Sequence, residues 1–160
     1  MRLALFQPDI PQNTGAAMRL AACLNTPLDI IDPCGFPFDD RRLRRTAMDY
    51  APACDLSRHV SWEAFVAAQR AVPGRRLVLM STAAAEPHVT FTFRAEDVLI
   101  AGRESFGVPD AVRQMCDAAV RIPLAPGVRS LNVVVASAIV LAEARRQLGW
   151  FAESPPGGPG

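Results

Sequence analysis

The chain has 160 residues, the length of one compact domain, and half of its residues are hydrophobic, so it can bury a core and general disorder is excluded. Its formal net charge is +1, and arginine is its only strongly basic residue type, so no global basic field attracts nucleic acid. Any contact with RNA must therefore come from local clusters of arginine.

Targeting and metal-binding signals are missing from the sequence. The four cysteines form no C-x-x-C pair and there are only two histidines, so no metal site is expected. The apolar run before Pro8 is too short for a signal peptide. The charge-free run at 130–142 is shorter than the roughly 20 residues that span a bilayer. We therefore expect a cytoplasmic protein with reduced thiols and no membrane contact.

Taken in chain order, the pattern of apolar and polar residues alternates between strands and helices. The first part is predicted to contain a strand at 2–7, a helix from the N-cap Asn13 to about residue 24, a strand at 28–31 and a short helix at 39–47. The second part is predicted to contain a helix at 62–71 capped by Ser61, strands at 77–81 and 98–101, a helix at 109–116, a strand at 119–122 and a final helix at 130–148. Residues 1–152 are expected to form one domain, and the Pro- and Gly-rich tail 153–160 to be disordered.

The segments 77–81 and 98–101 are apolar without alternation, which is typical of a parallel sheet covered on both faces. Such an α/β sheet binds ligands at the carboxyl ends of its strands. No G-x-G-x-x-G follows the first strand, and Gly102 and Gly107 have the spacing of a P-loop without the Lys-Ser or Lys-Thr that should follow. A flavodoxin-like nucleotide-binding protein is therefore disfavoured.

Three segments of the sequence carry residues that could form a site. The first is PQNTG at 11–15, with Arg19 one turn later, and the second is LIAGRESFGVP at 99–109. The third is IPL at 122–124, followed by RSLN at 129–132 and EARRQ at 143–147. Arg19 has small neighbours one turn away, Gly15 before it and Ala22 and Cys23 after it. These neighbours leave room for the guanidinium to reach a phosphate or a sugar. An ordinary surface arginine is the alternative.

The second and third segments each allow a plain structural explanation. Gly102 and Gly107 suit a tight turn, and they equally suit a close approach of the backbone to a ligand. Glu104, the only acid of that loop, is either solvated or part of a pocket. Ser130 and Asn132 are good helix N-caps, and at the start of a buried helix they can also face a ligand.

In this order and spacing, the three segments resemble SPOUT-class 2′-O-ribose methyltransferases, above all the small single-domain type that modifies the wobble nucleotide (position 34) of tRNA. The resemblance covers nearly the whole chain. It implies an α/β fold with a mostly parallel sheet flanked by helices and a deep trefoil knot near the C-terminus. It also implies S-adenosyl-L-methionine (AdoMet) as the methyl donor, with no need for a metal.

The resemblance further implies roles for individual residues. The expected cofactor-binding residues are Met80, Gly102, Glu104, Gly107, Ile122, Ser130 and Leu131. The expected catalytic residues are Arg19, Ser130 and Asn132. Because a guanidinium has a pKa above ~12 and is a poor free base, we expect Arg19 to orient the target phosphate and acidify the ribose hydroxyl. Base action assisted by an RNA phosphate is the alternative.

Two surfaces are expected to contact partners. The basic cluster at 41–45 suits the phosphates of a tRNA anticodon stem-loop, with Arg41, Arg42 and Arg45 joining Arg19 in RNA binding. A solvated face paired with the acids at 39–40 is the alternative. The helices at 13–24 and 130–148 carry more apolar surface than one chain covers, which predicts an obligate homodimer. An arginine of one subunit could then complete the site of the other.

Two positions depart from the family pattern. Relatives often carry a small polar residue where this chain has valines at 133–135, and commonly a tyrosine where it has Ala142. The first departure bears on the methyl pocket and the second on dimer or RNA contacts. The alternatives that stay open are a related knotted methyltransferase acting on rRNA or another tRNA position, and a non-catalytic RNA-binding dimer.

Overall fold

The computed structural model describes residues 1–38 and 41–150. Within these residues, seven strands form one sheet in the order β3-β2-β1-β6-β4-β7-β5, and every neighbouring pair runs parallel. The strands are β1 (Arg2–Phe6), β2 (Leu28–Ile31), β3 (Leu56–His59), β4 (Leu77–Met80), β5 (Glu86–Pro87), β6 (Val98–Ala101) and β7 (Ala118–Arg121). The mostly parallel α/β sheet expected from the sequence is confirmed.

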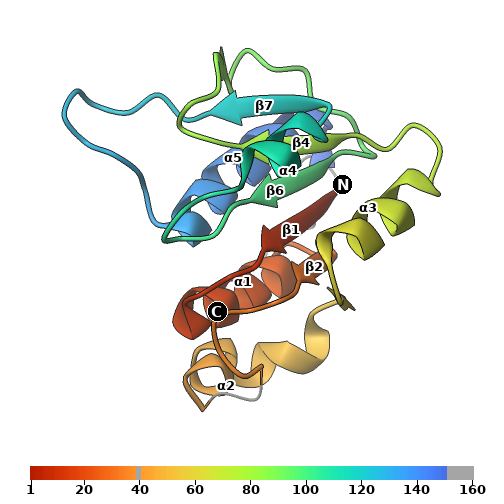
Figure 1. Cartoon of the computed structure of the whole chain (residues 1–160), viewed down its shortest axis with the longest axis vertical. Helices are drawn as coiled ribbons and strands as arrows, with labels where there is room; N and C mark the ends of the chain where they lie inside the picture. Colours follow the sequence, from red (N-terminus) through yellow and green to blue (C-terminus); the bar gives the residue numbers. More distant parts are fainter. Residues whose placement is uncertain (39–40, 151–160) are drawn as a thin grey trace.

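Helices cover both faces of this sheet. They are α1 (Pro11–Cys23), α2 (Arg41–Ala47), α3 (Trp62–Arg70), α4 (Asp110–Gln114) and α5 (Val133–Gln147), with a 3-10 helix η1 (Met48–Ala53). α1 and α5 pack on one face, and α3 and α4 pack on the other (Figure 1). None of the helices in the described part of the chain is long and apolar enough to cross a membrane.

The central strands explain why the core lies on both sides of the sheet. Leu3 of β1 pairs with Leu28 on one side and with Leu99 on the other, and all three are fully buried. On the second face, Trp62 and Phe65 of α3 pack in one cluster with strand residues. β1 and β6 meet where the strand order reverses, and in parallel sheets this is the place where ligands bind.

Helix α1 begins before the expected cap, so the prediction of Asn13 as the N-cap is wrong. Ile10 is the N-cap residue, and Pro11 begins the helix, where its missing N–H loses no partner. Asn13 lies inside the first turn, and its side chain contacts other segments instead.

Helix α5 begins later than residue 130. The Asn132 side chain accepts hydrogen bonds from the N–H groups of Val134 and Val135, so the helix starts immediately after it. Asn132 therefore acts as the expected cap. Ser130 and Leu131 do not belong to the helix, because they lie in the loop that precedes this cap.

Other boundaries differ modestly from the predictions. Ser61 caps α3 as expected, since its side chain accepts from Ala64 N over 3.2 Å. Pro109 is the N-cap of the short α4 rather than a helical residue. The sequence pattern did not predict β3, β5 or η1. The predicted start of a helix at 39–40 and the tail at 153–160 lie outside the described residues.

α1 and α2 approach each other backbone to backbone at Gly15. A Cβ at this position would lie 2.7 Å from the Leu43 carbonyl oxygen, so no larger residue fits without moving α2. Leu43 is buried, as expected, while exposed positions on α2 are taken by Arg41, Arg42 and Arg45. Gly15 therefore sets how these arginines lie relative to α1.

Candidate active site

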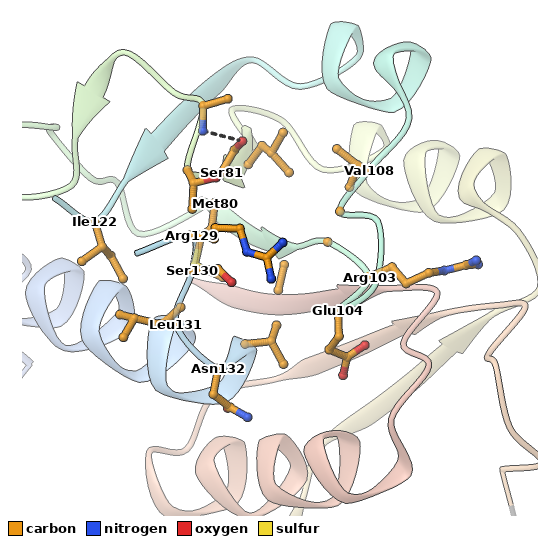
Figure 2. Close-up of a pocket in the computed structure, with 18 of the residues that line it drawn as sticks. Met80, Ser81, Arg103, Glu104, Val108, Ile122, Arg129, Ser130, Leu131 and Asn132 are labelled. Atoms are coloured by element: carbon orange, nitrogen blue, oxygen red, sulfur yellow. Dashed lines mark hydrogen bonds between the residues drawn. The ribbon is translucent and has the colours of Figure 1, made fainter. Parts of the chain in front are cut away.

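A hollow of about 670 Å³ opens where the segments that follow β1, β4, β6 and β7 meet (Figure 2). Its volume lies in the range of about 300–1,000 Å³ that is usual for small-molecule sites. The residues that line it come from three segments, 81–83 after β4, 102–108 after β6 and 122–132 after β7. Because all strands run parallel, their carboxyl ends bring these distant segments to one edge of the sheet.

The loop after β6 is closed on itself by two backbone hydrogen bonds. Arg103 N donates to Gly107 O over 2.9 Å, and Gly107 N donates to Arg103 O over 2.7 Å. Gly107 has a φ of +68°, which favours glycine, whereas Gly102 is required by space, since a Cβ there would lie 2.8 Å from the Gly107 carbonyl carbon. Arg103 turns away from the hollow (Figure 2) and donates to Gln7 O over 3.1 Å. We call this loop, residues 102–108, the braced wall.

Glu104 joins the braced loop to α1 and, through α1, to α5. Its Oε2 accepts from Asp9 N over 3.0 Å, and its Oε1 accepts from Asn13 Nδ2 over 3.1 Å. Asn132 Nδ2 in turn donates to Asn13 Oδ1 over 3.0 Å. The three segments singled out in the sequence are therefore linked by one chain of hydrogen bonds.

Glu104 and Asp9 are neighbouring carboxyl groups whose pKa values are shifted in opposite directions. Burial, followed by the neighbouring Asp9 carboxyl, raises the pKa of Glu104 above its usual value. Burial also acts to raise the pKa of Asp9, but hydrogen bonds with Glu104 and Ser105 outweigh it and lower that pKa. Ser105 Oγ donates to Asp9 Oδ2. Of the two carboxyl groups, Glu104 is therefore the one that takes up a proton at the higher pH.

The wall after β7 is built differently. Residues 122–131 are all described, and their one internal hydrogen bond runs from Val128 N to Ala125 O at 3.4 Å. The segment extends away from the sheet before it returns to α5 (Figure 1). Arg129 points toward the middle of the hollow (Figure 2). We call residues 122–131 the open wall.

The structure places the predicted site residues in two groups. One group lines the hollow and consists of Met80, Gly102, Glu104, Gly107, Ile122, Ser130, Leu131 and Asn132. No site role was predicted for Ser81, Arg113 and Arg129, which line it too. Arg129 belonged to a recognised segment, whereas no local signal marks the other two. Within the described residues, no three His, Cys, Asp or Glu are grouped to hold a metal ion.

The second group lies outside the hollow, on the side of α1 that faces α2. The guanidinium carbon of Arg19 lies 4.8 Å from the ring centroid of Tyr50 in η1, which is within the range of a cation–π contact. Arg19 is exposed, and we use the name arginine surface for the set formed by Arg19, Arg41, Arg42 and Arg45. The chain has one tyrosine, and its position beneath Arg19 had no signal in the sequence of α1.

An apolar strip borders the hollow on α5. Val135 and Ile139 have 48% and 36% of their surface exposed, and Leu131 and Ile10 beside the hollow have similar exposure. The chain therefore does not cover α5 on every face by itself. The prediction that α5 carries apolar surface which the chain itself does not cover is met by this strip.

The chain is similar to known proteins along nearly its whole length. Residues 1–142 match the SpoU rRNA Methylase family. A protein of Beijerinckia indica subsp. indica named tRNA (cytidine(34)-2′-O)-methyltransferase is 58% identical over 151 residues, which cover 94% of each chain.

Two solved structures share the fold. One, described as "Structural insights into the 2-OH methylation of C/U34 on tRNA", has a TM-score of 0.86 and 39% identity, with 93% of this chain and 96% of that chain covered. The other, an AdoMet-bound rRNA methyltransferase from Sinorhizobium meliloti, has a TM-score of 0.82 and 30% identity. The match covers 92% of this chain but 56% of that one.

Proposed function

Because the chain belongs to the SpoU rRNA Methylase family, we propose that it transfers a methyl group from AdoMet to the ribose 2′-hydroxyl of the wobble nucleotide, position 34, of tRNA. The observation that carries this proposal is the hollow at the strand ends, where Glu104, Asn13 and Asn132 join the three recognised segments. The chain covers 94% of the tRNA-modifying relative but 56% of the rRNA methyltransferase, which favours tRNA over rRNA as the substrate.

The residues present fit AdoMet. The hollow has the volume of a small-molecule site, and Met80, Ile122 and Leu131 give it apolar surface for the adenosine. Gly102 and Gly107 leave the backbone of the braced wall uncovered by side chains, so its polar groups can face a ligand closely. Glu104 and Ser130 complete the cofactor-binding set that we propose.

AdoMet supplies a methyl group that its sulfonium already activates, so the chain has to position the ribose and assist loss of the hydroxyl proton. Ser130 and Asn132 line the hollow and are proposed to hold the ribose beside the methyl group. Arg19 is proposed to bind the adjacent phosphate and lower the pKa of the hydroxyl by its positive charge. A guanidinium suits this role because it stays protonated and binds phosphate with two N–H groups.

Arg19 does not line the hollow of its own chain, and this supports a homodimer in which the arginine of one subunit completes the site of the other. The apolar strip with Val135 and Ile139 borders the hollow and would be covered by the second copy. For Arg19 to complete the site, such a dimer would have to bring the partner's α1 near the hollow.

The arginine surface is proposed to hold the anticodon stem-loop. Arg41, Arg42 and Arg45 are exposed on one short helix whose position is set by Gly15. Phosphate contacts of this kind supply a large part of the affinity for nucleic acid and carry no base specificity themselves. We further propose that tRNA modification takes place in the cytoplasm, where bacterial tRNA is found.

The deep trefoil knot of SPOUT enzymes also belongs to this proposal. Its support is the path of the chain, which leaves the sheet through the open wall and returns as α5 to pack against β6 and α1 (Figure 1). We propose residues 1–152 as the single methyltransferase domain, with 153–160 as a tail.

Methyl transfer from labelled AdoMet to purified tRNA and rRNA, followed by mapping of the modified nucleotide, tests the proposed function. We expect a 2′-O-methyl group at position 34 of tRNA. A label on rRNA or at another tRNA position would identify a related knotted methyltransferase. RNA binding without any methyl transfer would identify a non-catalytic RNA-binding dimer.

A further inference from the structure

Phe106 stands out among the apolar side chains because 86% of its surface is exposed, more than for any other large hydrophobic residue in the described parts of the chain. A single exposed apolar residue needs no explanation by itself. Val60, for example, is 83% exposed and lies between β3 and α3, away from any hollow named above. The argument for Phe106 comes from its surroundings.

The first observation is the rigidity of the backbone that carries the ring. Phe106 lies between Arg103 and Gly107, whose two mutual hydrogen bonds close the loop. Ser105 and Glu104 tie the same loop to Asp9. A ring on a braced loop loses little backbone freedom when a ligand stacks on it, so binding is not opposed by the ordering of a flexible segment.

The second observation is the place of the ring between two hollows. Phe106 borders the large hollow and also a smaller groove of about 190 Å³, lined by Phe6, Gln7, Arg103, Gly107, Val108 and Pro109. A flat ligand beside the reacting ribose can therefore lie against the ring without entering the space of the cofactor.

The third observation is the charge around the ring. Arg113 and Arg129 line the large hollow, and Arg103, which turns away from that hollow, lines the smaller groove. Glu104, the acid among the lining residues, is engaged with Asp9 N and Asn13. An exposed aromatic ring next to arginines is the combination that binds single-stranded nucleic acid, because bases stack on the ring while phosphates are attracted by the cations.

We propose that Phe106 is a stacking platform for an unpaired nucleobase of the RNA, next to the ribose that is methylated. This inference rests on the proposed function. Stacking on an aromatic side chain is sequence-tolerant and strengthens binding of a base by about 5- to 150-fold. Phe106 therefore contributes to the position of the strand and leaves discrimination between bases to hydrogen-bonding groups.

The test uses the full-length protein and an anticodon stem-loop that carries the fluorescent base 2-aminopurine at each unpaired position in turn. Stacking quenches its fluorescence. We expect Phe106→Ala to weaken RNA binding about 5- to 150-fold and to abolish the quenching at one position, while AdoMet affinity measured by calorimetry stays within about twofold of wild type. Phe106→Trp keeps the ring and should restore both RNA signals. Val60→Ala removes an equally exposed apolar side chain and should change neither.

Three results would overturn the inference. Unchanged quenching and RNA affinity in Phe106→Ala would show that no base stacks there. Weaker AdoMet binding would mean that the ring covers the cofactor, and a changed molecular mass in light scattering would place the ring in a subunit interface. Methylation of the stem-loop by the wild-type protein reports on the proposed function separately. If another RNA is the substrate, the same variants are compared on that RNA, and if no RNA binds, both proposals fail.

Discussion

Helix α1 connects two regions that are built in opposite ways. At its first turn, Asn13 is held between Glu104 and Asn132 by hydrogen bonds of 3.1 and 3.0 Å, inside the linked walls of the hollow. Six residues later, Arg19 lies exposed over the ring of Tyr50 in η1, which directly follows α2. On its braced side the hollow is shaped by backbone and amide groups that hydrogen bonds hold in place, whereas the arginine surface consists of long charged side chains.

This difference indicates what each region can recognise. A hollow with one braced wall suits a small molecule, because the groups of that wall need no reordering when they bind it. Exposed arginines on a helix suit a polyanion, whose attraction is long-range, sensitive to salt and tolerant of small displacements. The same helix therefore joins the hollow proposed for the cofactor to the surface proposed for RNA.

The largest expected effect comes from replacing Arg19, which belongs to the arginine surface and is proposed to act on the ribose at the hollow. Arg19→Ala should lower single-turnover methylation at saturating RNA by about 10²–10⁴-fold, because the ribose hydroxyl loses the cation that assists loss of its proton. AdoMet affinity should stay near normal, since Arg19 does not line the hollow. Arg19→Lys should restore little, because an ammonium cannot make the planar two-pronged contact. Methylation within a few-fold of wild type would remove Arg19 from the mechanism.

Mixing two inactive chains tests whether Arg19 acts across a dimer. In a mixed dimer of Arg19→Ala and Gly102→Val subunits, an arginine that acts on the partner's hollow leaves one site intact and places both changes in the other. Random mixing should then restore about a quarter of wild-type activity, since half of the dimers are mixed and each has one intact site. If Arg19 serves its own subunit, every site carries a defect and no activity returns.

The two walls of the hollow should respond differently to the same change. Gly102→Ala places a Cβ 2.8 Å from the Gly107 backbone, so the braced wall must shift, and AdoMet affinity measured by calorimetry should fall at least about tenfold. Gly127→Ala in the open wall meets no atom within 4 Å. Its φ of +84° adds strain of about 1–2 kcal/mol, which a loosely held segment can relax. We expect less than a threefold change in affinity, and an equal loss in both variants would show that the walls do not differ.

The sequence predicted the parts of this architecture that depend on local pattern. The continuous apolar runs of β4 and β6 predicted buried parallel strands, and Ser61 predicted the start of α3. β3 was missed because it is a polar edge strand, whose His59 makes a 2.7 Å contact with the buried Asp29 of its neighbour. Such a contact has no signal in the local pattern.

The site shows the same limit. Asn13 has the local signature of an N-cap, but its partner Glu104 is 91 residues away in the chain, and Asn132 is 119 residues away. Only the parallel sheet brings them together. The motif resemblance marked the residues that line the hollow, and it could not show that Arg19 lies outside it on Tyr50.

The arginine surface should show a salt dependence that the hollow lacks. Replacing Arg42 and Arg45 together by alanine should lower the slope of log affinity for RNA against log salt by about 1.5, with AdoMet binding unchanged. Arg94→Ala, at an exposed position before β6, removes one charge elsewhere and should leave the slope nearly as it is. Filter binding over a salt series provides the measurement. An equal change per arginine in both variants would mean that net charge alone is responsible.

The smallest expected effect is the pH dependence of stability that comes from Glu104 in the braced wall. Because the pKa of Glu104 is raised, its contribution to stability is complete below its usual value of 4.5 and is lost as the pH rises through the raised pKa. The pKa of Asp9 is lowered, so its contribution to stability is present above its usual value of 3.8 and is lost as the pH falls through the lowered pKa. The pH ranges in which the two carboxyl groups change the stability therefore do not overlap. In urea unfolding from pH 4.5 upward, the stability of wild type relative to Glu104→Gln should therefore decline and then level off. The total change should stay below about 1 kcal/mol because solvent partly screens a half-buried carboxyl.

Glu86→Gln, at an exposed position outside the hollow, controls for the loss of a carboxylate as such. A difference that grows with pH would show that the wall is held by the ionised form of Glu104, whose two oxygens accept from Asp9 N and Asn13.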